Sequence, residues 1–88
     1  MSMTTTVQVT VRFFAAARAA AGAEAETISL QPGTTVADLV GQLGERNADL
    51  AKVLKRCSFL CDGIAVRDTA STLAPGQTVD VLPPFAGG

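Results

Sequence analysis

One amphipathic helical segment stands between strand-like segments on both sides, and this order limits the folds open to the chain. The segment begins at Thr35, which has capping-box spacing to Asp38, and its predicted end lies near Asn47. Apolar residues recur along it at i, i+3, i+4 and i+7, namely Val36, Leu39, Val40 and Leu43. This spacing gives a single apolar stripe, so we expect the helix to lie across one face of a sheet.

The segments around this helix alternate between apolar and polar residues or are bounded by turn residues, as strands are. Predicted strands cover residues 7–13, 24–30, 57–61, 64–66 and 78–82. Asp62-Gly63 predicts a two-residue hairpin turn, and shorter helices are expected at residues 15–21 and around residues 50–54. Two strands, a main helix and three strands do not fit a parallel α/β fold. They predict an α+β fold of the β-grasp type, a mixed sheet covered on one face.

The composition is that of one small globular domain spanning residues 1–88. Hydrophobic residues make up 48% of the chain and charged residues 17%. A net charge of −1 and a pI near 5.1 leave no electrostatic footprint for nucleic acid. The longest apolar run, residues 13–23, contains Arg18 and is too short to span a membrane. Because residues 1–6 lack the features of a secretory signal, we expect a cytoplasmic protein.

The inventory of metal-binding and nucleophilic side chains is small. The chain has two cysteines, Cys57 and Cys61, and no histidine. It therefore fails the ligand count for a structural zinc or iron–sulfur site, and it has no imidazole for a catalytic triad. If both cysteines lie on one strand, their Cα atoms are about 13 Å apart, beyond disulfide range. We interpret them as buried structural thiols and expect no metal.

Three cations lie close together in sequence, in the short helix predicted around residues 50–54 and just after it: Lys52, Lys55 and Arg56. They could form a basic patch. The preferred interpretation is a solvated helix flank, with cations placed favourably near the helix carboxyl end.

The chain ends in a narrow tail, Pro83-Pro84-Phe85-Ala86-Gly87-Gly88. The glycine pair has no Cβ atoms and can enter a slot that any side chain would block, while the prolines stiffen the exit from the last strand. Fully extended, residues 83–88 would carry the terminal carboxylate about 20 Å beyond that strand. We therefore interpret residues 83–88 as a flexible probe for a partner's pocket.

The chain resembles the MoaD/ThiS family of ubiquitin-like sulfur carriers, and within it the small subunits of molybdopterin synthase. The resemblance covers nearly the whole chain and rests on three motifs: Phe13-Phe14-Ala15-Ala16-Ala17-Arg18, Thr35-Val36-Ala37-Asp38-Leu39 and Leu82-Pro83-Pro84-Phe85-Ala86-Gly87-Gly88. It implies the same β-grasp fold.

The resemblance also implies a mechanism centred on Gly88. A ubiquitin-activating-like adenylyltransferase would use ATP to adenylate the Gly88 carboxylate, and a sulfur donor protein would convert it to a thiocarboxylate. The tail, Pro83 to Gly87 included, would then enter the large synthase subunit of a heterotetramer and donate sulfur to cyclic pyranopterin monophosphate. On this interpretation the chain binds no cofactor and is not an enzyme alone, because the large subunit holds the catalytic residues.

Side-chain parity predicts an apolar surface where the tail leaves the sheet. If Val11 and Phe13 face the helix, Phe14 points to the open face or sits at the strand end, and Leu82 lies opposite to Val81 in the same way. An exposed apolar patch there is typical of a partner surface. Alternatively, Phe14 packs under the helix that follows it. The family resemblance adds Arg18 to this partner surface.

Other functions use the same tail. A sulfur carrier for thiazole (thiamine), cysteine or tRNA thiolation would differ only in its sulfur acceptor. A ubiquitin-like modifier would form isopeptide bonds with lysines, and a plain interaction domain would leave Gly88 unreacted.

Overall fold

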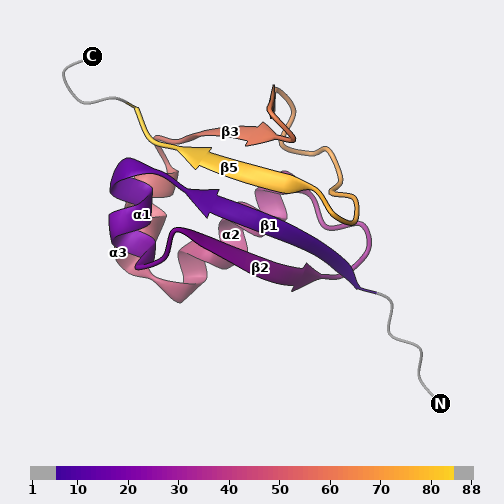
Figure 1. Ribbon diagram of the computed structural model, residues 1–88, viewed down its shortest axis with the longest axis horizontal. Helices are drawn as coiled ribbons and strands as arrows, with labels where there is room; N and C mark the ends of the chain where they lie inside the picture. The colour runs from indigo at the N-terminus through magenta and orange to yellow at the C-terminus, as the bar shows by residue number, and fades with distance from the viewer. Residues whose placement is uncertain (1–5, 85–88) are drawn as a thin grey trace.

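Strand β1, Val7–Phe13, lies inside the sheet and pairs with a different strand on each side. The computed structural model describes residues 6–84. In this range β1 pairs antiparallel with β2, Ala25–Leu30, and parallel with β5, Thr78–Leu82. On the far side of β5 lie β3, Ser58–Cys61, and β4, Ile64–Ala65, so the order is β2-β1-β5-β3-β4. The first and last strands are thus central neighbours (Figure 1).

Three helices lie on one side of this sheet (Figure 1). They are α1, Ala15–Ala21; α2, Val36–Arg46; and α3, Ala48–Leu54. The predicted capping box is present, because the Thr35 hydroxyl accepts from the Asp38 N–H at 3.1 Å and the Asp38 carboxylate accepts from the Thr35 N–H at 3.1 Å. Asn47 ends α2 and caps α3 with its side chain. The fold is the predicted α+β β-grasp arrangement.

The core lies between the sheet and the helices. Val9, Val11 and Phe13 are each no more than 2% exposed, and they face the helix stripe of Leu39 and Leu43. Two further valines complete the sheet side, Val79 and Val81. The predicted alternation in β1 and β5 is confirmed, and the opposite faces of these two strands point away from the helices.

Two ion pairs link elements far apart in sequence. Arg46, in the last turn of α2, contacts Glu26 on β2. Its Nη1 lies 3.0 Å from Oε1 of Glu26, and its Nη2 lies 2.8 Å from Oε2. The hydrogen bonds to Glu26 raise the pKa of Arg46 above its ordinary value. The other pair, between Arg12 and Asp80, lies on the open face and belongs to the candidate site.

Two glycines give opposite expectations for stability. Gly22 closes α1 at φ 74°, whereas Gly41 lies inside α2, and an added Cβ would meet nothing within 4 Å at either position. We expect Gly22→Ala to lower the free energy of unfolding by about 1 kcal/mol, because a side chain is strained in the left-handed conformation. Gly41→Ala should raise it by up to about 1 kcal/mol through helix propensity. Urea unfolding of both variants checks this, and a Gly22→Ala variant as stable as Gly41→Ala would contradict it.

Candidate functional site

The root of the tail is part of the sheet. Strand β5 is hydrogen-bonded on both sides, to β1 and to β3, and it leads directly into Pro83. Pro83 is buried and Pro84 is exposed. Because proline has no N–H to donate, the pair ends the ladder and sends the chain out of the fold. Phe85, Ala86, Gly87 and Gly88 lie outside the described residues.

Phe14 and Leu82 lie at the same end of the two central strands. The register of β1 and β5 pairs Phe13 with Val81, and the Phe14 N–H donates to the Val81 carbonyl at 3.3 Å. Phe14 is 37% exposed and Leu82 is half-buried. The Arg12 guanidinium lies over the Phe14 ring, 5.4 Å from its centroid. Since Arg12 projects from the open face, the Phe14 ring lies beside that face and not under α1.

Leu60 adds a third apolar side chain that the sequence analysis missed. The register pairs Leu60 with Asp80 and Ser58 with Leu82, so Leu60 lies on the open face, while Phe59 and Cys61 pack against the core. The alternation of side-chain directions within residues 58–61 could have placed Leu60 on the face opposite to Phe59 and Cys61. We call Phe14, Leu60 and Leu82 the open-face patch.

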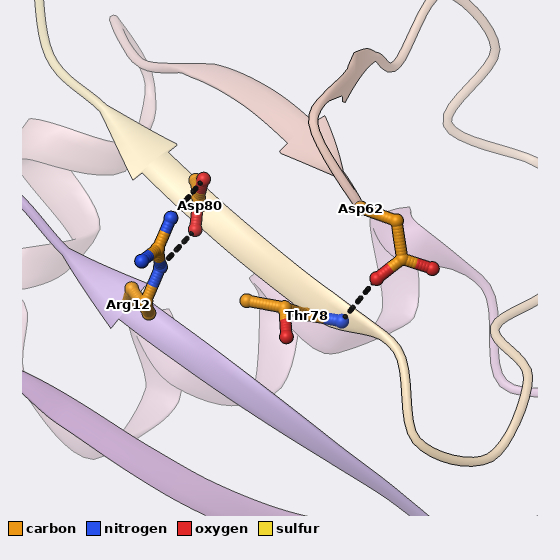
Figure 2. A network of polar contacts seen from close by, with 4 residues as sticks. All are labelled: Arg12, Asp62, Thr78 and Asp80. Carbon is orange, nitrogen blue, oxygen red and sulfur yellow. Dashed lines mark hydrogen bonds and ion pairs between the residues drawn. The ribbon is translucent and has the colours of Figure 1, made fainter.

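An ion pair lies within this patch. The Arg12 Nε and Nη2 donate to the two Asp80 carboxylate oxygens at 2.6 Å and 2.8 Å, across the parallel strands (Figure 2). The Asp80 side chain is 9% exposed and that of Arg12 is 51% exposed, so the carboxylate is covered and the guanidinium reaches solvent. The hydrogen bonds and charge of Asp80 raise the pKa of Arg12 above its ordinary value. The patch therefore includes an ion pair whose guanidinium, and not its carboxylate, is open to solvent.

The hairpin beyond β3 is tied to the start of β5. Asp62 accepts from the Thr78 N–H at 2.9 Å through its side chain, and its own N–H donates to the Thr78 carbonyl at 2.8 Å (Figure 2). Asp62 and Gly63 have φ angles of 50° and 82°, as the predicted two-residue turn requires. Side chains from two different elements thus hold β5, Asp62 at its start and Arg12 at its middle residue, Asp80.

Arg18 is exposed on α1, with a nitrogen 3.9 Å from a Glu24 oxygen. It lines a hollow of about 290 Å³ together with Phe14, and Leu82 is not among the residues that line this hollow.

The cysteines differ from their expected placement. Cys57 precedes β3, so the two are not on one strand, and each is half-buried instead of fully buried. Both thiols are free, and the Cys57 thiol donates to the Val53 carbonyl at 3.2 Å. Burial raises the pKa of Cys57, and burial together with the nearby Asp62 raises the pKa of Cys61. Both thiols are therefore poor nucleophiles at neutral pH.

These shifts predict slow alkylation and an alkaline limit to stability. At pH 7, iodoacetamide should label the folded chain more slowly than the urea-unfolded chain. The stability gained from burying neutral thiols is present below their ordinary pKa of 9.0 and is lost as pH rises through the higher folded values. A Cys57→Ala/Cys61→Ala variant should lose this part of the alkaline destabilisation. Equal labelling rates for folded and unfolded chain would contradict the interpretation.

Residues 6–84 contain no group of three or more side chains suited to holding a metal ion. In the same range, no helix combines the length and the apolar character needed to cross a membrane.

The fold defines a ubiquitin-like β-grasp domain. Residues 11–88 match the ThiS family. The molybdopterin synthase sulfur carrier subunit of Chlamydomonas reinhardtii is 32% identical over 83 residues, covering 93% of this chain and 100% of that protein. The chain belongs to the ThiS family.

Solved structures agree with this assignment. The HVO 2177 protein of Haloferax volcanii superposes with a TM-score of 0.83 and 30% identity, over 94% of this chain and 88% of that one. A putative molybdopterin converting factor subunit 1 of Pyrococcus furiosus gives a TM-score of 0.81 and 28% identity, over 90% and 99%.

Proposed function

We propose that this chain is the sulfur carrier subunit of molybdopterin synthase. The observation that carries the proposal is the match to a protein of that name over 93% of this chain and all of the relative. The structure adds physical support, because the tail continues a central strand and leaves the sheet beside the open-face patch.

The reacting group is the carboxylate of Gly88. A carboxylate is a poor acyl donor until one of its oxygens becomes part of a good leaving group. An ATP-dependent adenylyltransferase joins that carboxylate to AMP and releases pyrophosphate. A persulfide on a sulfur donor protein then attacks the acyl carbon and displaces AMP, and a thiol reductant cleaves the acyl disulfide to leave a thiocarboxylate. The partners supply the acid, the base and the phosphate site.

The large subunit of the synthase is the proposed acceptor of the tail, in a heterotetramer. The thiocarboxylate sulfur attacks the cyclic pyranopterin monophosphate there, and water later releases the Gly88 carboxylate for another cycle. The catalytic residues belong to the large subunit, so this chain is the sulfur-donating part of a transferase. Phe14, Leu82, Leu60 and Arg18 are proposed to contact the partners while the tail from Pro83 to Gly88 is inserted.

Intact mass tests the chemistry. The native chain is incubated with ATP, the adenylyltransferase and a sulfur source, and the expected product has sulfur in place of oxygen at the carboxyl terminus. Mixing this product with the large subunit and cyclic pyranopterin monophosphate should form molybdopterin and restore the original mass. Absence of the sulfur form, under conditions that charge a known carrier, would overturn the proposal.

The same reaction separates the other functions. A carrier for thiazole, cysteine or tRNA thiolation would gain sulfur but would not form molybdopterin with the large subunit. A ubiquitin-like modifier would appear on immunoblots joined to lysines of other proteins. An interaction domain would show no ATP-dependent change at Gly88.

A further inference from the structure

A groove beside the root of the tail combines an apolar lining with a cationic rim. It encloses about 640 Å³ between α1, α3 and the residues that follow β5. These segments meet at one end of the molecule, where the β5 arrow ends beside α1 and α3 (Figure 1). Its apolar lining consists of Ala16, Val53, Pro83 and Pro84, and its rim consists of the exposed Lys52, Lys55 and Arg56. We call it the basic groove.

Within residues 6–84, the cations of the groove form no ion pair, in contrast to three other cations of the chain. The chain has seven lysines and arginines, all within residues 6–84. Three of them pair with carboxylates in that range: Arg12 with Asp80, Arg18 with Glu24 and Arg46 with Glu26. Of the remaining four, three line the groove and the fourth is Arg67. No aspartate or glutamate is among the lining residues. Among the described residues of this chain of net charge −1, three of the four cations without an ion pair therefore lie together in the groove.

We propose that the basic groove binds an acidic peptide segment of a partner protein, with an apolar side chain among its carboxylates. The apolar lining favours a hydrophobic residue, and the three cations favour carboxylates around it. A nucleic acid is a poor fit, because the chain is acidic overall and the described residues that line the groove include no aromatic side chain for stacking.

The position of the groove indicates which protein supplies this segment. Pro84 lines the groove, and the next residues lead to the proposed reacting carboxylate. A segment bound there belongs to the protein that takes up the tail, so the groove gives that protein a second contact beside the open-face patch. This identification of the partner rests on the proposed function, whereas the acidic and apolar chemistry of the occupant does not.

The test uses a short fluorescent peptide of glutamates around a central leucine, with a lysine analogue as control. Binding to the full chain is followed by anisotropy, and the contacted residues by amide chemical shifts. We expect chemical-shift changes at Ala16 and at residues 52–56, and binding that weakens as the salt concentration is raised. The lysine analogue should not bind. Replacing Lys52, Lys55 and Arg56 together with Gln should weaken binding about tenfold, as expected for three exposed ion pairs.

Arg67→Gln is the matched control, because it removes a cation outside the groove. It should change peptide binding by less than about twofold. Circular dichroism checks that the triple variant is folded, and Lys55→Gln alone should give a smaller loss. No shifts at residues 52–56, or an equal loss with Arg67→Gln, would overturn the groove assignment.

A chain ending at Pro84 tests whether the protein's own last residues are the occupant. If the peptide binds this shortened chain but not the full chain, the tail fills the groove in cis and the partner assignment is wrong. Failure of the native chain to acquire sulfur would instead overturn the proposed function, and peptide binding to the groove would still support the acidic occupant.

Discussion

Deletion of Gly88 is expected to abolish thiocarboxylate formation while leaving the fold unchanged. The reaction needs the acyl carbon at one position relative to the nucleotide, and displacement by one residue removes that geometry. A one-residue extension should therefore be as inactive as the deletion. Gly87→Val keeps the length and should also fail, because its side chain cannot enter a slot shaped for glycine.

The control for these variants is stability. The core residues lie between Val7 and Val81, so we expect changes at residues 87 and 88 to alter the free energy of unfolding by no more than about 0.5 kcal/mol, as surface changes usually do. Urea unfolding should therefore superimpose for all variants, while intact mass separates them from the native chain. A thiocarboxylate on the extended variant would contradict the role assigned to Gly88.

Phe14→Asp is expected to weaken binding to the large subunit by about 30-fold or more, the loss of one buried aromatic anchor. The fold should tolerate this change. Phe14 is the N-cap of α1 and makes no side-chain capping bond, whereas aspartate is a preferred N-cap residue. The new carboxylate would also lie near the Arg12 guanidinium, which now lies over the ring. Calorimetric titration of the large subunit measures the affinity.

Ile64→Asp is the matched control. Ile64 is a large apolar residue on β4, 73% exposed, and two strands, β5 and β3, lie between β4 and the strand that leads into Phe14. The same chemical change there should leave the affinity within about twofold of native. Equal losses for both variants, or native affinity for Phe14→Asp, would contradict the open-face patch as a partner surface.

Much of this arrangement could be predicted from local patterns. The capping spacing at Thr35, the Asp62-Gly63 turn and the alternation in β1 and β5 each depend on residues close in sequence, and each prediction is confirmed. The order of elements predicted a mixed sheet covered on one face, and this prediction is confirmed as well. Such local patterns are informative because side-chain directions repeat with different periods in helices and strands, so a single sequence can distinguish the two.

The features that were missed depend on register between distant strands. Asp80 lies on the open face, as its parity with Leu82 requires, and its burial under Arg12 follows from a pairing across 68 positions of sequence. Leu60 joins the open-face patch because β3 aligns it with Asp80. The basic groove requires α3 to end where Pro83 and Pro84 leave the sheet, which no local pattern encodes.

The central place of β5 has a mechanical consequence. A partner that binds residues 83–88 and pulls on them would apply force along β5. That force would act on two ladders of hydrogen bonds at once, the parallel ladder with β1 and the antiparallel ladder with β3. Hydrogen bonds in such ladders lie across the pulling direction and must be sheared together instead of being opened one after another. The Arg12–Asp80 ion pair adds a side-chain contact between β1 and β5. We therefore expect the sheet to resist unfolding when force is applied through its last strand.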